Sequence, residues 1–221
     1  MGDPGTIGPS GQNHNVKQLF NLAAQTEMNA LNAGGNNVIA CRVSTIDDFK
    51  QALIGGLPGE SLTGQITGGV YYFGHSGEYH TTFGPLVFDE SGVFVGQIQA
   101  PNTNILSTNV SDLSLVQSSY NNGNALGSNA AMWLKGCQSA VKFGGPTSIA
   151  QLISNNITRG VYGYDVGTYF SHDTIANDRY VNGKGRTTSE VLPIYMIPAG
   201  APHHKPLPLA CVPGGGECAK Q

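Results

Sequence analysis

Two residues able to perform nucleophilic catalysis together each follow a short apolar run that ends in glycine. His75 comes after residues 70–74 (VYYFG), and Cys137 comes after residues 131–136 (AMWLKG). If the two runs are neighbouring strands of a parallel sheet, both side chains leave it at the edge where the carboxyl ends of the strands lie. A thiol beside an imidazole forms a nucleophile–base pair. The pattern therefore predicts a dyad in which His75 accepts the Cys137 proton or holds the thiolate as an ion pair.

Attack of a thiolate on an amide carbonyl also requires fixed N–H donors for the oxyanion that forms. The backbone N–H groups of Gly77 and Cys137 are the expected donors. A glycine close to the histidine also lets a substrate carbonyl approach without meeting a Cβ atom. The chemistry expected at this site is attack on a carbonyl carbon, with no metal ion and no organic cofactor.

Each of these residues also has a purely structural interpretation. Cys137 can be an inert buried thiol, because free cysteine is among the most buried residue types, and His75 can be an ordinary loop histidine. Cys41 lies in the middle of an apolar run and is expected in the core. A serine nucleophile is disfavoured, because the Gly-x-Ser-x-Gly elbow needs glycine at position 78, where the chain has Glu78.

The composition favours a single domain with a sizeable core. The chain has 221 residues, of which 39% are hydrophobic and only 11% are charged, against about a quarter in an average protein. Its net charge is −3 and it has no run of lysine or arginine, so we expect no nucleic-acid partner. No membrane span and no signal peptide are expected. These patterns favour a cytoplasmic protein.

Helical and strand patterns alternate along the chain. Helices are expected over residues 16–31, from a Ser44–Asp47 capping box to residue 54, over 109–116 and over 146–153. Strands are expected at 38–43, 70–73, 86–88, 93–98, 131–135, 161–170 and 191–197, the third and fourth forming a hairpin. This alternation predicts an α/β fold, a mostly parallel sheet with helices on both faces. The expected organisation is a flexible leader at 1–15, one domain at 16–198 and a Pro/Gly-rich tail at 199–221.

The expected tail holds four residues with metal-binding chemistry, His203, His204, Cys211 and Cys218. Their irregular spacing favours a mobile tail over a zinc site. In an oxidising setting the two cysteines would alternatively close a small disulfide. The wide spacing of all four cysteines in the chain argues against a fold built on disulfides.

The histidine and cysteine motifs resemble those of the caspase-like cysteine peptidases, which include caspases, gingipains, separases and CHAT-domain proteases. That family has its catalytic histidine before a glycine at the end of one core strand and its cysteine at the end of the next, the roles that His75 and Cys137 match. Residues 135–139 (KGCQS) share the cysteine and the following glutamine with the caspase motif. Ser76 separates His75 from Gly77, so the resemblance leaves either Ser76 or Gly77 as the oxyanion donor.

The resemblance implies a cysteine endopeptidase with a caspase-like fold, whose element order matches residues 38–170, and a protein substrate. A catalytically silent binding domain of the same fold is the alternative, as is acyl transfer or deamidation by the same dyad. Calcium, which activates some family members, would fall to Asp173 and Asp178, although these are expected to be solvated. The leader and the low charge resemble cargo domains of bacterial polymorphic toxins, which implies delivery into a target cell and an inhibitor or immunity protein as partner.

The resemblance also suggests which residues would select the substrate. In this family the pocket for the residue before the cut is lined by the strand after the cysteine strand and by the strand before the histidine strand. The first carries Asp165, with Gly163 and Gly167 leaving room, and the second carries Arg42. Because a buried charge must be paired, Asp165 implies cleavage after lysine or arginine, and Arg42, the second choice, implies cleavage after an acidic residue. Alternatively, Asp165 caps a turn and Arg42 lies on the surface.

Overall fold

The structure is a computed structural model that describes residues 6–7, 13–14, 16–41, 43, 45–54, 56–57, 60–61, 65–77, 80–82, 86–88, 94–97, 104–106, 110–113, 126–142, 147–171, 195–198 and 206–220. The helices are α1 (Val16–Ala33), α2 (Ile46–Ile54), the 3-10 turn η1 (Val110–Leu113) and α4 (Ile149–Ile157). The central sheet contains β5 (Gly69–Phe73), β11 (Ala131–Lys135), β12 (Val161–Gly163), β15 (Leu209–Cys211) and β16 (Ala219–Lys220). Smaller sheets are formed by β1 (Thr6–Ile7) with β2 (Asn13–His14), β3 (Gly56–Leu57) with β4 (Glu60–Ser61), β8 (Leu86–Phe88) with β9 (Phe94–Gln97), β13 (Thr168–Ser171) with β14 (Tyr195–Pro198), and β10 (Asn104–Leu106) with β7 (His80–Thr82) and β6 (His75–Gly77).

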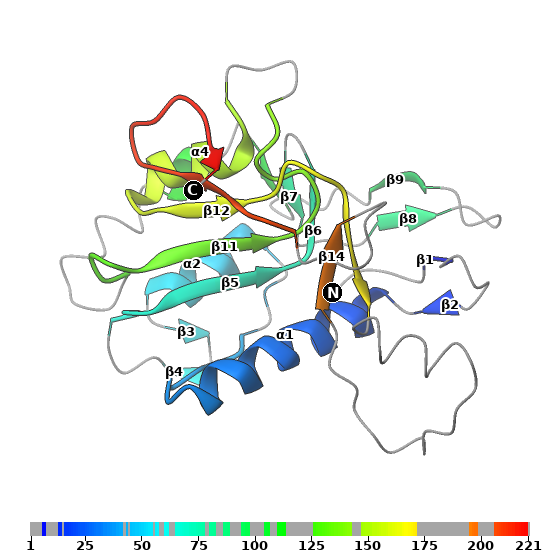
Figure 1. Cartoon of the computed structure of the whole chain (residues 1–221), viewed down its shortest axis with the longest axis horizontal. Helices are drawn as coiled ribbons and strands as arrows, with labels where there is room; N and C mark the ends of the chain where they lie inside the picture. The colour runs from blue at the N-terminus through cyan, green and yellow to red at the C-terminus, as the bar shows by residue number, and fades with distance from the viewer. Residues whose placement is uncertain are drawn as a thin grey trace.

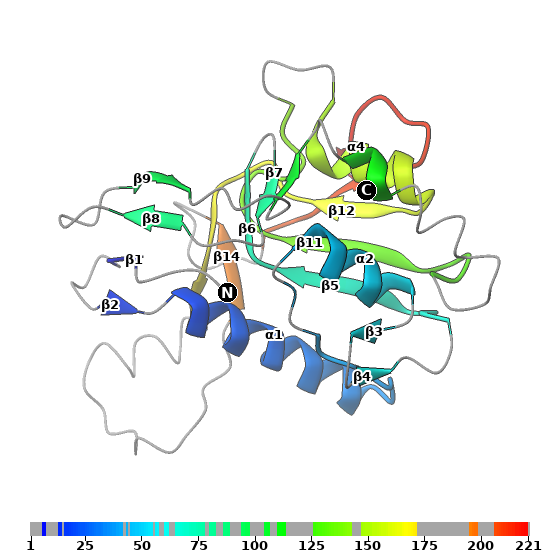
Figure 2. The same cartoon turned by 180° about the vertical axis from the view of Figure 1, so that it is seen from behind.

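The central sheet is open and has the strand order β16–β15–β12–β11–β5. β5, β11 and β12 run parallel, whereas β15 and β16 join the β12 side antiparallel. Figures 1 and 2 show these strands with α2 behind the sheet in the first view and in front of it in the second. Parallel strands, of which β11 and β12 are connected through α4, together with α1 and α2 give the chain the α/β character that the sequence predicted.

One face of the sheet forms the hydrophobic core. Met132 and Leu134 on β11 are fully buried, whereas their neighbours in the strand are half-buried, because successive side chains of a strand point to opposite faces. Ile153 of α4 belongs to the same core. The Phe49 ring of α2 packs edge-on against Tyr72 of β5, with centroids 6.0 Å apart. Packing of both helices on this face fixes which residues of β5 and β11 point inward.

The opposite face carries a stack of three aromatic rings, one from each parallel strand. Trp133 lies opposite Tyr71 and Tyr162 in the two strand pairings, and its ring stacks on theirs with centroids 4.7 and 5.0 Å apart. The six-membered edge of the indole also lies close over Gly69, where a Cβ atom would have no room. Because a slip by one residue would move these rings to the core face, the stack holds the register of the sheet.

The predicted strand at 161–170 is divided into two by a turn at residues 164–167. The turn follows β12 because the carbonyl oxygens of Tyr164 and Val166 accept hydrogen bonds from backbone N–H groups of the segment after β11, both at 3.0 Å. β13 then leaves the central sheet and pairs with β14. The local apolar pattern predicted a continuous strand here. It contains no information about residues 138–140, whose backbone N–H groups bond to this segment in place of a neighbouring strand.

Two helices begin at side-chain caps. In α2 the Asp48 N–H donates to Thr45 Oγ1 at 3.0 Å, and the Thr45 N–H donates to the Asp48 carboxylate at 3.1 Å. This capping box lies one residue after the predicted Ser44–Asp47 box. In α4 the Ser148 hydroxyl accepts from the Gln151 N–H at 3.2 Å.

The predicted hairpin at β8 and β9 is confirmed, because the two strands pair antiparallel.

The expected strand at 38–43 is wrong for the residues that are described there. Residues 38–41 and 43 have no regular secondary structure, and β5 is an edge strand among the described strands. Ile39 is 38% exposed and Cys41 is half-buried, so Cys41 is not the core residue that was expected. An apolar run becomes a strand only where its backbone groups find a paired neighbour.

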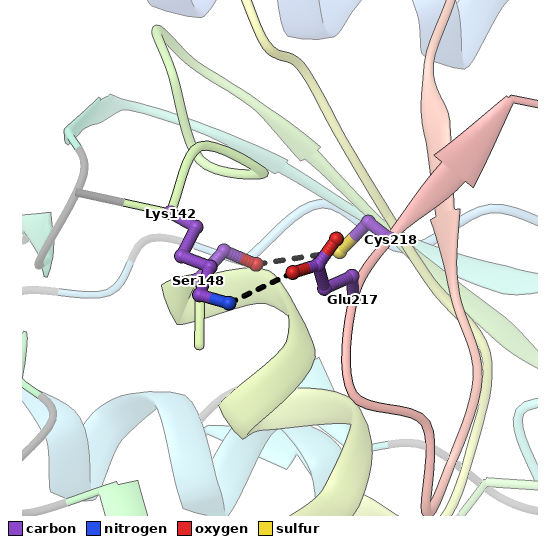
Figure 3. Close-up of polar contacts among 4 residues, drawn as sticks. All are labelled: Lys142, Ser148, Glu217 and Cys218. Atoms are coloured by element: carbon purple, nitrogen blue, oxygen red, sulfur yellow. Dashed lines mark hydrogen bonds and ion pairs between the residues drawn. The ribbon is translucent and has the colours of Figure 1, made fainter. Parts of the chain in front are cut away.

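The end of the chain belongs to the sheet and is not a separate tail over residues 206–220. β15 pairs with β12, and Cys211 is fully buried and disulfide-bonded to Cys218. Figure 3 shows how the segment meets the start of α4: Lys142 Nζ lies 2.8 Å from Glu217 Oε1, and Ser148 Oγ lies 3.3 Å from Cys218 Sγ. Because a disulfide sulfur has no hydrogen, the Ser148 hydroxyl is the donor.

Candidate active site

The register between β5 and β11 brings the two residues of the predicted dyad to the same edge of the sheet. Phe73 lies opposite Lys135 in this parallel pair, and His75 and Cys137 each follow two positions later. Neighbouring strands lie about 4.8 Å apart. β6, which begins at His75, turns out of the sheet at this point and contacts β11 (Figure 1). The two strand exits are therefore neighbours, as the spacing of the apolar runs predicted.

Cys137 is a free, half-buried thiol held by one residue of β13. Its Sγ–H donates to the Thr168 carbonyl oxygen at 3.0 Å. The sulfur also accepts from the Thr168 backbone N–H at 3.2 Å and from its Oγ1–H at 3.6 Å. The side chain is therefore fixed in position at the end of β11 and is not inside the hydrophobic core.

The turn after Cys137 is also fixed by backbone contacts. Gln138 has φ 48°, in the left-handed region that costs a residue with a Cβ about 1–2 kcal/mol. Its N–H donates to the Val166 carbonyl oxygen, and the Ala140 N–H donates to that of Tyr164, both at 3.0 Å. Strained backbone persists where the surroundings over-determine it, and such positions cluster at functional sites.

Lys135, at the end of β11 and two positions before Cys137, lies near Glu27 of α1. Lys135 Nζ lies 3.9 Å from Glu27 Oε2 and 5.7 Å from the centre of the Tyr71 ring. Burial, and next the Glu27 carboxylate, raise the pKa of Tyr71 and raise that of Tyr164 to about 12. Both phenols therefore keep their protons at neutral pH and are not available there as bases.

The other residues predicted for the site lie in β6 and in the turn after β12, or fall outside the described residues. Ser76 and Gly77 lie in β6, where they pair with Thr81 and His80. Asp165 is exposed in the turn beside the Cys137 segment. Arg42 lies outside the described residues.

Gly163 does not leave room for a ligand, which corrects the expectation from the sequence. A Cβ atom at this position would lie 2.8 Å from Ser139 Oγ and 3.1 Å from the Ala140 backbone nitrogen. The Tyr164 N–H donates to the same Ser139 hydroxyl at 3.2 Å, and Ser139 is fully buried. The missing side chain therefore makes space for the protein's own turn.

No metal site is found in the part of the chain that the structure describes, since no three His, Cys, Asp or Glu residues gather there. Cys211 and Cys218 are unavailable as zinc ligands because they are bonded to each other. The remaining candidates, Asp173, Asp178, His203 and His204, lie outside the described residues.

Thr168 was missed by the sequence analysis. Nothing local marks it, because a threonine in a strand-like run is ordinary. Its contacts with the thiol join residues 31 positions apart, and a separation of that size appears only once β13 is placed against the end of β11.

Comparison with known proteins gives no match to any family model, to any curated protein or to any solved structure. None of the described helices is long and apolar enough to cross a membrane.

Proposed function

We propose that this chain is a cysteine endopeptidase in which Cys137 is the nucleophile and His75 the base. One observation carries the proposal: parallel, adjacent β5 and β11 are in a register that puts these residues at equal distances beyond Phe73 and Lys135. The half-buried position of the free thiol at a strand exit supports the same assignment. Such a dyad needs no metal ion or organic cofactor.

In the proposed reaction His75 takes the proton of Cys137, and the thiolate attacks the carbonyl carbon of the scissile peptide. Backbone N–H groups at Ser76 or Gly77, together with that of Cys137, stabilise the oxyanion. The C–N bond then breaks, His75 gives the proton to the leaving amine, and a thioester remains on Cys137. Water, activated by His75, hydrolyses the thioester and restores the thiol.

The arrangement of the helices supports a caspase-like architecture with helices on both faces of the sheet. α2 packs on the core face through the contact of Phe49 with Tyr72. α1 contacts β5 and reaches the half-buried face of β11 through Glu27 and Lys135. Because Leu134 is buried and Lys135 follows it in the strand, the two helices approach opposite faces.

A catalytically silent binding domain of the same fold is the second candidate. One observation favours it, because the thiol proton of Cys137 is donated to the Thr168 carbonyl. A thiol satisfied in this way can serve structure alone. Acyl transfer or deamidation by the same nucleophile is a further proposal. In acyl transfer an amine takes the acyl group of the thioester in place of water, and in deamidation the amide that is attacked belongs to a side chain of the substrate.

Selective labelling of Cys137 separates the enzyme from the silent domain. Cys41 is the other described cysteine that is not in the disulfide and is also half-buried, so it is an internal reference for the rate of reaction with iodoacetamide. An active dyad makes Cys137 react much faster than Cys41, and His75→Ala removes the difference. Equal rates in the wild-type protein would refute the dyad.

Exposure of a proteome to the wild type and to Cys137→Ala, followed by profiling of new N-termini, tests peptidase activity. New termini should appear only with the wild type and with the control Cys41→Ala. Modified but uncleaved substrates would instead favour acyl transfer or deamidation, and the same profile from Cys137→Ala would exclude this nucleophile.

For substrate selection we propose that Asp165 favours lysine or arginine before the cut. Its carboxylate is exposed in the turn whose next residue, Val166, bonds the segment after Cys137. A peptide library should show basic preference in the wild type and loss of that preference in Asp165→Asn. Cleavage after aspartate would instead support Arg42.

The disulfide supports delivery outside the cytoplasm over a cytoplasmic role. Disulfides form and persist in oxidising compartments, and Cys211 at the end of β15 is bonded to Cys218, the residue before β16. We propose an exported effector that acts on proteins of a target cell and is held inactive in its producer by an inhibitor protein. Recovery of an oxidised, active chain from the culture medium would support this, whereas a fully reduced cytoplasmic pool would oppose it.

A further inference from the structure

Thr168 touches the Cys137 sulfur through three different groups. Its carbonyl oxygen accepts from the thiol at 3.0 Å, its backbone N–H donates at 3.2 Å and its hydroxyl donates at 3.6 Å. Each of these contacts depends on where β13 starts, not on β11 itself.

The pairing of β13 with β14 leaves these backbone groups available for the sulfur. Thr168 lies opposite Pro198 in that antiparallel pair, and proline has no N–H to offer a neighbouring strand. The N–H and C=O of one strand residue point to the same side, so those of Thr168 point away from β14 when both meet the sulfur. The cysteine side chain therefore occupies the place that a third strand would take beside Thr168.

The three contacts respond differently when the thiol loses its proton. The N–H and O–H donors become stronger partners, because a hydrogen bond to a charged acceptor is stronger than one to a neutral acceptor. The carbonyl contact, in contrast, needs the S–H and turns repulsive toward a thiolate. The same residue thus holds the resting thiol through its carbonyl and the reactive thiolate through its two donors.

We infer that Thr168 is a positioning residue for Cys137: the backbone N–H and the hydroxyl of Thr168 hold the Cys137 thiolate in the orientation required for attack. The inference rests on the proposed function, since it assigns a role in the same reaction. Thr168 does not contact the substrate in this role and acts only through the cysteine.

The test compares Thr168→Val, which removes the hydroxyl and keeps the branched shape, with Thr168→Ser, which keeps the hydroxyl. The rate of Cys137 alkylation by iodoacetamide is measured by peptide mapping, with Cys41 of the same molecule as reference. We expect Thr168→Val to slow the reaction about three- to tenfold, the range expected for a hydrogen bond to a charged group with a long donor–acceptor distance. Thr168→Ser should react within about twofold of the wild type, because it retains the donor.

Thr67→Val is the matched control, since Thr67 is exposed and lies before the start of β5. It should leave both alkylation rates unchanged. A Thr168→Val rate for Cys137 equal to or above that of the wild type would overturn the inference. A loss that Ser does not rescue, or a parallel change at Cys41, would also overturn it by indicating a structural effect.

The outcome is separable from that of the proposed function. If no substrate is cleaved by the wild type but Thr168→Val slows Cys137 alkylation, the positioning role stands and the peptidase proposal fails. If substrates are cleaved and Thr168→Val cleaves them with unchanged kcat, the positioning role fails and the peptidase proposal stands.

Discussion

Replacement of Gly163 by alanine tests whether the turn after Cys137 is held as tightly as its contacts indicate. The new Cβ atom would lie 2.8 Å from Ser139 Oγ and 3.1 Å from both the backbone nitrogen and the Cβ of Ala140. Ser139 is fully buried and its hydroxyl accepts from the Tyr164 N–H. Neither neighbour can therefore move without disturbing other contacts.

Three effects determine the size of the change. Overpacking in a well-packed region costs about 1–3 kcal/mol, and loss of the Tyr164–Ser139 hydrogen bond costs about 1 kcal/mol more. The smaller entropy of the unfolded alanine variant offsets about 0.4–1 kcal/mol. We expect a net loss of about 2 kcal/mol in the free energy of unfolding, which lowers the melting temperature by about 4–8 °C for a chain of this size.

Gly160→Ala is the matched control. It lies in the turn before the same strand, has no atom within 4 Å of the added Cβ and does not have a positive φ. It should be neutral or slightly stabilising. Thermal and urea unfolding of both variants gives the comparison, and Gly163→Ala should also change the alkylation rate of Cys137. Equal stability of the two variants would refute the close packing of the turn.

Three further predictions concern stability. Burial raises the pKa of Tyr72 and raises that of Tyr164 to about 12, so the folded protein keeps these protons above the pH of about 10 at which an unfolded tyrosine loses them. The resulting stabilisation is complete below pH 10 and declines above it by about 1.4 kcal/mol per pH unit for each tyrosine; urea unfolding from pH 9 to 11.5 should show a shallower decline for Tyr72→Phe, and equal slopes would contradict the assignment. Removal of the disulfide by Cys211→Ser with Cys218→Ser should lower the free energy of unfolding by about 2.5 kcal/mol, because the unfolded chain regains the entropy of this short loop. Thermal unfolding with and without reductant measures the effect, and a melting temperature that reductant leaves unchanged would contradict this prediction. Lys142→Ala removes an ion pair between two exposed side chains and should leave the melting temperature unchanged, because such pairs contribute little; a clear drop would show that this pair anchors the C-terminal segment.

Local patterns in the sequence were enough to find the elements that carry the candidate site. The run before His75 and the run before Cys137 form β5 and β11, and the alternation of strands and helices predicted the α/β class. The periodicity of residues 16–31 predicted α1, and the spacing around residues 89–92 predicted the β8–β9 hairpin. These features depend on neighbours within a few positions, which a sequence displays directly.

The tertiary structure alone decided how these elements meet. The register of Phe73 with Lys135 follows from the buried side chains on one face and the stack around Trp133 on the other, and no local pattern contains that match. The turn at 164–167 and the contact of Thr168 with Cys137 exist because the segment after β11 bonds to backbone groups 24 to 31 positions away. The last segment belongs to the sheet for the same reason. β15 pairs with the edge of β12 that β11 leaves open, and the disulfide stabilises this arrangement. Backbone groups bond to whichever partner the whole fold brings near, so these pairings cannot be found from composition or spacing.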